Sequence, residues 1–305
     1  MALKFIQMIG IPGSGKTEQA RKLLGCNDTV LLSSDTIRGE ITGDVSDQTK
    51  NAEVFDVMLK RTCDALSSEK SVIYDATNIN YKRRRVLLEQ LKAHYDIEAI
   101  AIVMATPIQM CIDRQNERDR SVDKNVIWRM VRNFYVPYWY EGWDEIRIIY
   151  PEDNDEYIHQ LYRSDIESLL DKSSLLYEFD QKNPHHDLSL GEHMFQCYKS
   201  ICNKMYAESI REAALLHDLG KFYTQTFGED GVAHYFDHNN VSAYLSLFSR
   251  NGDLKHTLSR AAYIQWHMAP YFWKEEKTRN KYFRLLGEQF YDDLMVLHEC
   301  DEEAH

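Results

Sequence analysis

A glycine-rich octet near the start of the chain has the residue types and spacing that bind nucleotide phosphates. Residues 10–17 read GIPGSGKT, which fits the pattern GxxxxGK[ST] at every fixed position. Glycines let backbone N–H groups turn towards a phosphate chain, the lysine reaches the β and γ phosphates, and the hydroxyl can hold Mg²⁺. We therefore expect this loop to bind ATP and Mg²⁺ through Gly13, Ser14, Gly15, Lys16 and Thr17.

Two carboxylates that follow later apolar runs could act on the bound nucleotide. Asp35 follows the run TVLLSS and could accept the proton of an attacking hydroxyl. Arg38 lies on the same helical face and could bind a phosphate of the acceptor. Helix capping is the alternative role for Asp35. Asp75, which ends the run SVIYD, is expected to be the second carboxylate of the nucleotide site.

A spaced set of arginines could close over the nucleotide. In the stretch DRQNERDRSV, Arg114, Arg118 and Arg120 fall along a predicted helix, where they could stabilise the charge of a transferring phosphoryl group. A solvated surface role is the alternative for each arginine. The candidate catalytic residues of the first half are Lys16, Asp35, Arg38, Arg118 and Arg120.

Ten of the twelve histidines lie from His185 to His305, and this region also contains a His-Asp pair that is expected within an apolar helix, in the run LLHDLGK. An ionised aspartate in such a run is costly unless a partner or a metal offsets its desolvation. Imidazoles and carboxylates together suit divalent transition metals such as Mn²⁺, Co²⁺, Ni²⁺ or Zn²⁺. A hydrogen-bonded core or surface role is the alternative for each single histidine. The candidate ligands are His193, His217, Asp218 and Asp301 for one metal, with His238 and His267 extending the site to a second.

The elements that must position these residues differ between the two halves. Short apolar runs alternate with amphipathic stretches in the first half, which predicts an α/β domain with a parallel sheet and flanking helices. The expected strands are 3–10, 29–34, 71–76 and 97–105, with 147–150 as a fifth candidate. The second half shows no strand run and is expected to be mainly helical. We expect a P-loop kinase domain over 1–152, a helical connector over 153–180 and a metal-binding domain over 181–305.

Composition narrows the function classes. A length of 305 residues with 44% hydrophobic residues, 6 Pro and 13 Gly excludes a disordered or low-complexity chain and predicts two domains. No apolar run approaches the length of a membrane span, and the cysteine spacing shows no CxxC pair, so we expect a cytoplasmic protein with reduced thiols. The net charge of −12 falls on the second half and argues against salt-driven binding along a nucleic acid. Residues 82–85, KRRR, are either a local basic patch for a nucleic-acid end or a solvated helix start.

Residues 1–150 resemble the 5′-hydroxyl polynucleotide kinases of the P-loop kinase superfamily. The resemblance is carried by GIPGSGKT, LLSSDTIR, VIYDATNINYKRRR and VIWRMVRNF with Pro137. It implies that Asp35 is the general base, that Arg38 binds the acceptor, and that the lid arginines most nearly match Arg118 and Arg120. Kinases of small molecules, including nucleosides and sugars, share the loop and the DATN strand, so the acceptor stays open.

Residues 181–305 resemble the HD-domain phosphohydrolases through the order H…HD…H…H…D. The segments QKNPHH to GEHM and DHNNVSA are similar to HD domains attached to RNA-modifying nucleotidyltransferases. The resemblance implies hydrolysis of phosphomonoesters and 2′,3′-cyclic phosphodiesters. It also implies that His193, His217, Asp218 and Asp301 are the signature ligands, and Lys221 and His186 are candidates to bind the substrate phosphate.

The two resemblances together imply a bifunctional enzyme that heals nucleic-acid ends. A 5′ kinase and a phosphoesterase that clears 3′ or 2′,3′-cyclic phosphates would convert a broken pair of RNA ends into ligatable ends. RNA is favoured over DNA, and a separate RNA ligase is an expected partner. Two alternatives stay open: a small-molecule kinase fused to an HD nucleotidase, and an NTP-binding switch with a structural metal domain. The oligomeric state is not predicted.

Overall fold

The computed structural model describes residues 3–25, 28–118, 121–151, 171–184, 187–202, 206–249 and 252–304. The chain divides into two compact units. The first is Met1–Met130 with Glu141–Pro151, and the second is Val131–Tyr140 with Glu152–His305. The segment 131–140 thus groups with the helical unit, ahead of the expected domain border at residue 152. Most of the expected connector lies outside the described residues.

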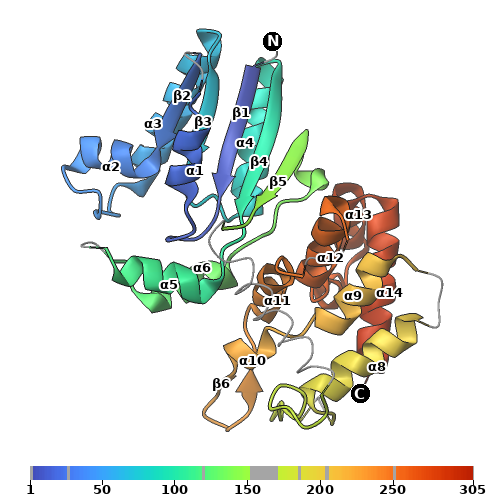
Figure 1. Ribbon diagram of the computed structural model, residues 1–305. Helices are drawn as coiled ribbons and strands as arrows, with labels where there is room; N and C mark the ends of the chain where they lie inside the picture. The colour runs from blue at the N-terminus through green and yellow to red at the C-terminus, as the bar shows by residue number, and fades with distance from the viewer. Residues whose placement is uncertain are drawn as a thin grey trace. The chain divides into compact units, whose positions relative to one another are not determined.

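The first unit is built on a sheet of five parallel strands (Figure 1). The strands are β1 (Leu3–Ile9), β2 (Thr29–Ser33), β3 (Ser71–Asp75), β4 (Ile97–Met104) and β5 (Glu145–Ile149), in the order β2-β3-β1-β4-β5. All four pairings are parallel. The prediction of a parallel sheet is confirmed, and the fifth candidate strand is part of it.

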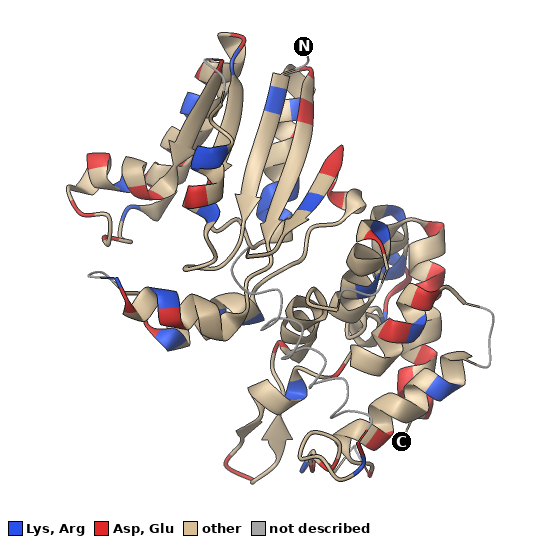
Figure 2. Ribbon diagram, in the orientation of Figure 1, with Lys and Arg blue, Asp and Glu red and all other residues tan. Residues whose placement is uncertain are grey.

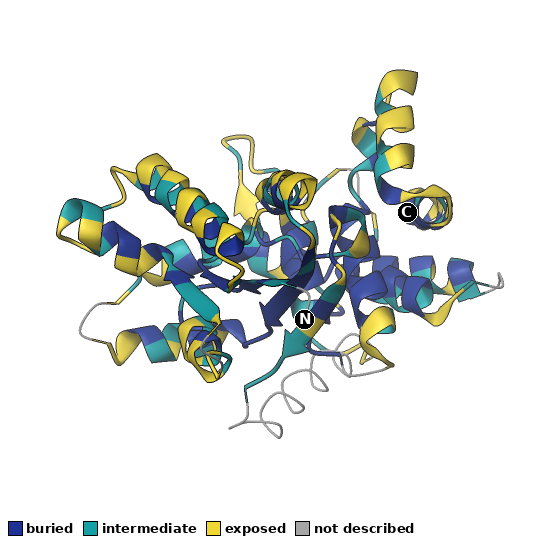
Figure 3. Ribbon diagram, turned by 90° about the horizontal axis from the view of Figure 1, so that it is seen from above, coloured by how far each residue is buried: buried dark blue, intermediate teal, exposed yellow. Residues whose placement is uncertain are grey.

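Helices lie on both faces of this sheet (Figure 3), so its strands are buried on both faces. Met8, Ile73 and Ile102 form one face with Ala20 of the first helix, whereas the rings of Phe5 and Tyr74 meet on the other. Parallel strands need crossover connections, and the amphipathic stretches between them supply these. The helices are α1 (Lys16–Lys22), α2 (Ser34–Thr42), α3 (Asn51–Ser67), α4 (Tyr81–His94), α5 (Ile108–Asn116) and α6 (Lys124–Arg132), with the short helix η1 (Trp139–Glu141).

A fully buried ion pair joins α4 to η1. The Arg84 Nε and Nη2 atoms donate to the two carboxylate oxygens of Glu141 at 2.7 and 2.6 Å. Trp143 Nε1 donates to the same carboxylate at 3.1 Å, and Arg84 Nη1 donates to the Asn78 carbonyl at 2.8 Å. Arg84 is therefore neither part of a basic surface patch nor solvated, which corrects both expectations for KRRR at this residue. Its partner lies 57 residues away in sequence.

Glu141→Ala is expected to lower the free energy of unfolding of the first unit by about 3–5 kcal/mol, because the Arg84 guanidinium would remain buried without its counter-charge. Glu89→Ala is the matched control, since Glu89 pairs with Arg85 on the same helix at the surface. Its loss should cost less than about 1 kcal/mol. Equal losses for the two variants in urea unfolding would contradict the buried pairing.

The second unit is mainly helical, as expected. Its elements are α8 (Leu190–Cys202), α9 (Glu208–Leu216), α10 (Lys221–Thr224), α11 (His238–Ser246), α12 (Leu254–Trp266), η3 (Pro270–Phe272), α13 (Glu276–Leu286) and α14 (Glu288–Glu303). Helix α9 packs against α8, α12 and α14. Because its residues Ile210, Ala213, Ala214 and Leu216 are buried, α9 provides the centre of the unit's core.

Three expectations for this half need correction. The segment 226–234 forms a short antiparallel hairpin of β6 (Thr226–Phe227) and β7 (Ala233–His234). Residues 171–179 form turns rather than the helix expected there, which Ser and Asp side chains favour by bonding the local backbone. The His217-Asp218 pair lies just beyond the end of α9 and not within it.

Charged residues are distributed unevenly over this unit. Figure 2 shows acidic residues along α14 and basic residues on α13. None of the described helices is long and apolar enough to cross a membrane.

Candidate functional site

The phosphate loop connects β1 to α1 in the first unit. Gly13 and Gly15 have φ angles of +84° and +88°, which favour glycine. A Cβ at Gly13 would also lie 2.5 Å from the Cys111 carbonyl oxygen. The Thr106 hydroxyl donates to the Ser14 carbonyl at 3.0 Å and so ties the loop to the segment after β4. The backbone is therefore held in the form in which its N–H groups can surround phosphates.

Lys16 and Thr17 of the loop are held by hydrogen bonds to neighbouring residues. Lys16 Nζ donates to the Ile11 carbonyl at 2.8 Å, and burial lowers the pKa of this lysine against the opposing effect of Asp75. The Thr17 hydroxyl donates to Asp75 Oδ2 at 2.7 Å. Burial raises the pKa of Asp75, and the hydrogen bond from Thr17 partly offsets this. Thr17 and Asp75 are thus adjacent at the carboxyl end of the sheet, where they could hold Mg²⁺.

Asp35 and Arg38 form an ion pair in the first turns of α2. Arg38 Nη1 donates to Asp35 Oδ1 at 2.7 Å, and Arg38 Nη2 donates to Asn51 Oδ1 at 2.9 Å. The Arg38 side chain is 6% exposed, whereas that of Asp35 is 68% exposed. The N-cap of α2 is Ser33, so the capping role considered for Asp35 is wrong. In such a pair, the fixed arginine can position a hydroxyl acceptor and the accessible carboxylate can deprotonate it.

Of the described arginines after residue 113, Arg114 contacts the phosphate loop. Its Nη1 donates to the Gly13 carbonyl at 3.4 Å. Arg118 is exposed, and its charge contributes to lowering the pKa of Lys16. Arg120 lies outside the described residues. Arg114 was considered in the sequence but was not among the candidate catalytic residues, because spacing alone does not distinguish the three arginines.

Asn78 ends the DATN stretch, but it was assigned no role from the sequence. It has a φ angle of +49°, and its Nδ2 donates to the Met8 carbonyl at 2.7 Å. The Gly10 N–H donates to the Thr77 carbonyl at 3.0 Å. The segment after β3 is therefore clamped to the start of the phosphate loop, and the buried Arg84 holds the Asn78 carbonyl from behind. The signal in the sequence is the asparagine itself, which tolerates the left-handed region better than other side chains.

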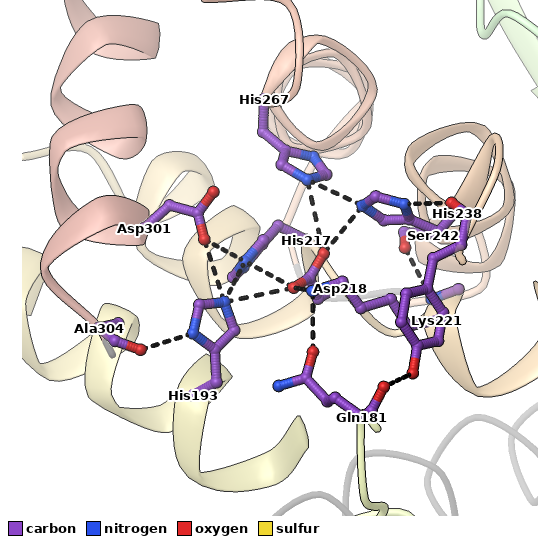
Figure 4. A network of polar contacts seen from close by, with 12 residues as sticks. Gln181, His193, His217, Asp218, Lys221, His238, Ser242, His267, Asp301 and Ala304 are labelled. Atoms are coloured by element: carbon purple, nitrogen blue, oxygen red, sulfur yellow. Dashed lines mark hydrogen bonds and ion pairs between the residues drawn. The ribbon is translucent and has the colours of Figure 1, made fainter. Parts of the chain in front are cut away.

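In the second unit, four candidate ligands converge on one point (Figure 4). The Nε2 atoms of His193 and His217 lie 3.0 and 3.1 Å from Asp301 Oδ1 and 3.2 Å from each other. Asp218 Oδ2 lies 3.2 Å from His193 Nε2. All four residues are buried, and their ligand atoms lie within 4.8 Å of one another. They come from α8, the turn after α9 and α14.

A second group shares Asp218 with the first. Asp218 Oδ1 lies 3.0 Å from His238 Nε2 and 3.5 Å from His267 Nε2, and the two histidine nitrogens are 3.3 Å apart. The structure thus brings together all six metal-ligand candidates in two adjacent groups. The two carboxylate oxygens of Asp218 face one group each. Such a carboxylate can bridge two metal ions.

All four imidazoles are oriented in the same way. Each Nδ1 lies 2.6 to 2.9 Å from a backbone carbonyl oxygen, to which it must donate because a carbonyl only accepts. The Nε2 atom then carries the lone pair in the neutral ring and faces the carboxylates, the arrangement found in metal-ligating histidines. The acceptors are the carbonyls of Ala304, Ala214, Tyr235 and Ile264 for His193, His217, His238 and His267 respectively.

The donor set fits divalent metal ions. Asp218 Oδ1 is buried without a hydrogen bond of suitable geometry from any described group, although two imidazole nitrogens point at it. Burial lowers the pKa of His267, which keeps its Nε2 lone pair available. The pKa values of Asp218 and Asp301 lie well below the usual range, because the surrounding cations outweigh the effect of burial. The buried His and Asp clusters could therefore hold a metal.

Lys221 places an ammonium group beside this cluster. Its Nζ lies 2.6 Å from Asp218 Oδ2 and donates to Gln181 Oε1 at 2.9 Å. The Tyr235 ring lies beside the same ammonium, and the Tyr235 hydroxyl donates to the Gln181 carbonyl. Gln181 and Tyr235 were not among the candidates, since their contacts join segments far apart in sequence. His186 lies outside the described residues.

Metal binding is expected to release protons from this cluster. Although burial alone would lower it, Asp218 and Asp301 raise the pKa of His217 to about 10, so at neutral pH and without metal the ring carries a second proton, on Nε2, and a positive charge. A metal ion needs that lone pair, and its affinity should therefore fall as the pH falls. Calorimetric titration with Mn²⁺ at about pH 8 in two buffers of different ionisation enthalpy measures the proton release. Equal heats in both buffers would contradict it.

Residues 5–137 match the family model described as an AAA domain. Together with the sheet order and the phosphate loop, this match identifies the fold of the first unit. It is a P-loop kinase-like domain. The match ends before the histidine cluster.

Three solved structures are similar to parts of the chain. A chain of the Pnkp1/Rnl/Hen1 RNA repair complex matches at 22% identity and a TM-score of 0.38, over 43% of this chain and 44% of that one. A Chloroflexus aurantiacus protein described as a kinase matches at 17% identity and a TM-score of 0.41, over 55% and 97%. A gluconokinase from Sinorhizobium meliloti matches at 13% and 0.36, over 49% and 83%. The chain thus spans less than half of the matched RNA repair chain. These scores are low and bear on no function.

Proposed function

We propose that the chain is a bifunctional enzyme that heals nucleic-acid ends, with one activity in each unit. The first unit transfers the γ phosphate of ATP to a 5′-hydroxyl end. The second hydrolyses a 3′ phosphate or a 2′,3′-cyclic phosphate. The observation that carries this proposal is the presence, in one chain, of a phosphate loop with an acceptor pair and of a buried His and Asp cluster with metal-ligand geometry.

The kinase reaction divides between the residues of the first unit. Gly13, Ser14 and Gly15 surround the phosphates with backbone N–H groups, and Lys16 balances their charge. Asp35 accepts the proton of the 5′-hydroxyl while Arg38, fixed by Asn51, holds the acceptor end in place. A regulatory switch needs no such base, so the pair supports chemistry over mere nucleotide binding.

In the second unit, the chain's own residues would hold one or two divalent metal ions, which supply an activated water when bound. His193, His217 and Asp301 would hold one ion, His238 and His267 would hold the other, and Asp218 would contribute to both. The backbone carbonyls that accept from each Nδ1 orient the imidazoles. Lys221 beside Asp218 places a positive charge where a substrate phosphate would enter.

RNA ends are the favoured substrate, since 2′,3′-cyclic phosphates require a 2′-hydroxyl. The net charge of −12 fits the recognition of an end through a few phosphate contacts better than binding along a strand. A separate RNA ligase is the expected partner, because the products are ends ready for joining. The cytoplasmic location stays a prediction.

The kinase assignment is tested by giving the protein [γ-³²P]ATP with a 5′-hydroxyl oligonucleotide, beside a panel of nucleosides and of gluconate. Label transfer to the oligonucleotide in preference to the small molecules is expected. Preferential transfer to a nucleoside or a sugar acid would replace the proposal by a small-molecule kinase. ATP binding without transfer to any acceptor would favour the regulatory switch.

A further inference from the structure

An exposed aromatic side chain follows the short hairpin of the second unit. Phe236 is 65% exposed, although phenylalanine is usually buried. Its ring stacks on the His234 imidazole with 5.4 Å between centroids and an interplanar angle of 15°. Since one face of the ring rests on His234 while most of its surface stays exposed, the other face is open to solvent.

The backbone holds Phe236 next to the metal-ligand cluster. The preceding residue, Tyr235, contacts Lys221 with its ring and the Gln181 carbonyl with its hydroxyl. The carbonyl of Tyr235 accepts from His238 Nδ1 at 2.7 Å, so it also orients a candidate metal ligand. Between the two, Asp237 has a φ angle of +61°. This left-handed turn costs free energy in a residue other than glycine, and such strain concentrates at functional sites.

Side chains of the segment 235–238 differ in whether they face the cluster or the solvent. Tyr235 and His238 contact the cluster, whereas the Phe236 ring stays exposed against His234. The Phe236 ring is thus fixed between Tyr235 and His238, two residues that contact the proposed phosphoesterase site. Because the ring is exposed, it can stack on a flat partner. A nucleobase attached to the phosphate being hydrolysed is such a partner, because every base presents a π face.

We propose that Phe236, supported by His234, is the stacking platform for the nucleobase at the 3′ end whose phosphate enters the metal-ligand cluster. This inference rests on the proposed hydrolase function and specifies its substrate class as a nucleotide end rather than a simple phosphomonoester. Phe236 binds the base and does not contact the reacting atoms. The platform reads the presence of a base and not its sequence, because stacking tolerates every base.

The test compares hydrolysis by the parent protein with hydrolysis by Phe236→Ala. Three substrates are used: a 2′,3′-cyclic phosphate oligonucleotide, the matching 2′,3′-cyclic mononucleotide, and a 3′-phosphate oligonucleotide whose last nucleotide is abasic. For both substrates with a base, KM should rise roughly 5–150-fold, the range for loss of base stacking on an aromatic ring, with kcat little changed. The abasic end should show the same KM with either protein. Phe236→Tyr should restore the KM of the parent protein. A rise with the oligonucleotide alone would overturn a platform for the terminal base and place the contact further along the strand.

Phe227→Ala is the matched control, since Phe227 is exposed on the same hairpin but pairs with Ala233 and so points to the face opposite His234. This variant should behave as the parent protein. If Phe227→Ala also raised KM, and if Phe236→Ala raised KM for the abasic substrate, the effect would come from general damage to the hairpin. That result would overturn the proposal.

A binding measurement keeps the inference separate from the hydrolase assignment. An oligonucleotide with a 3′ phosphate and 2-aminopurine as its last base should lose fluorescence when the parent protein binds it, and this quenching should be absent with Phe236→Ala. Quenching without hydrolysis would leave the platform standing and the proposed activity wrong. Quenching that is unchanged in Phe236→Ala would contradict the platform whatever the activity.

Discussion

Asp35→Ala should reduce transfer of the γ phosphate to a 5′-hydroxyl end by roughly 10²–10⁴-fold, the usual contribution of a general base. The Asp35 side chain is mostly exposed and is held at 2.7 Å from Arg38, so its carboxylate is free to meet a hydroxyl of an incoming acceptor. The variant should still bind ATP with normal affinity, because Lys16, Thr17 and Asp75 remain in place. Transfer rates and fluorescent nucleotide binding are measured on the same preparation.

Glu40→Ala is the matched control for this variant. Glu40 is an exposed acidic residue on the same helix, and its partner is Arg61 instead of Arg38. Its removal should leave transfer unchanged. Asp35→Asn distinguishes the base from a purely positional role, because the amide preserves the shape and a hydrogen bond to Arg38 but cannot accept a proton. Near-normal transfer by Asp35→Asn would show that Asp35 is not the general base.

Asp218→Asn should abolish binding of the second metal ion and lower hydrolysis of a 2′,3′-cyclic phosphate by roughly 10²–10⁴-fold, which corresponds to several kcal/mol of lost transition-state stabilisation. Asp218 is the residue common to both ligand groups, with one carboxylate oxygen facing each. An amide keeps the volume of the side chain but removes the negative charge that faces the four imidazoles and the Lys221 ammonium. Metal content by elemental analysis and the hydrolysis rate are the two measurements.

Two controls accompany Asp218→Asn. Asp292→Asn changes an exposed acidic residue on α14, the helix that also carries Asp301, and should leave metal content and hydrolysis unchanged. The kinase activity of Asp218→Asn itself should persist, since the residues proposed for it lie in the other unit. If Asp218→Asn retained two metal ions per chain, the bridging role would be wrong, and a simultaneous loss of kinase activity would indicate misfolding.

The features that could be predicted from the sequence depend on residues close together in the chain. The phosphate loop is contained in residues 10–17, and the Asp35 and Arg38 pair lies within one helical turn. The strand runs are continuous apolar segments because the parallel sheet is buried on both faces. The metal-ligand set was expected from residue types alone, and its geometry depends on the α-helical packing around α9.

The features that could not be predicted depend on contacts across long stretches of chain. Arg84 is one of four consecutive basic residues, and only its partner Glu141 explains why it is buried while Arg83 is exposed. Nothing in the sequence pairs Lys221 with Gln181, or leaves Phe236 exposed beside a buried cluster. Such contacts are decided by tertiary packing, which local propensity does not encode.

The claim that one chain heals both ends of a break is tested most directly with a single RNA substrate that carries a 5′-hydroxyl and a 2′,3′-cyclic phosphate. The protein is incubated with this RNA, ATP, Mg²⁺ and Mn²⁺, and the mass of the intact product identifies the groups at both ends. We predict a strand with a 5′ phosphate and a 3′ end freed of its cyclic phosphate, with Asp35→Asn blocking only the first change and Asp218→Asn only the second. An RNA that keeps both original ends, while the same preparation phosphorylates a nucleoside or a sugar acid, would contradict the claim.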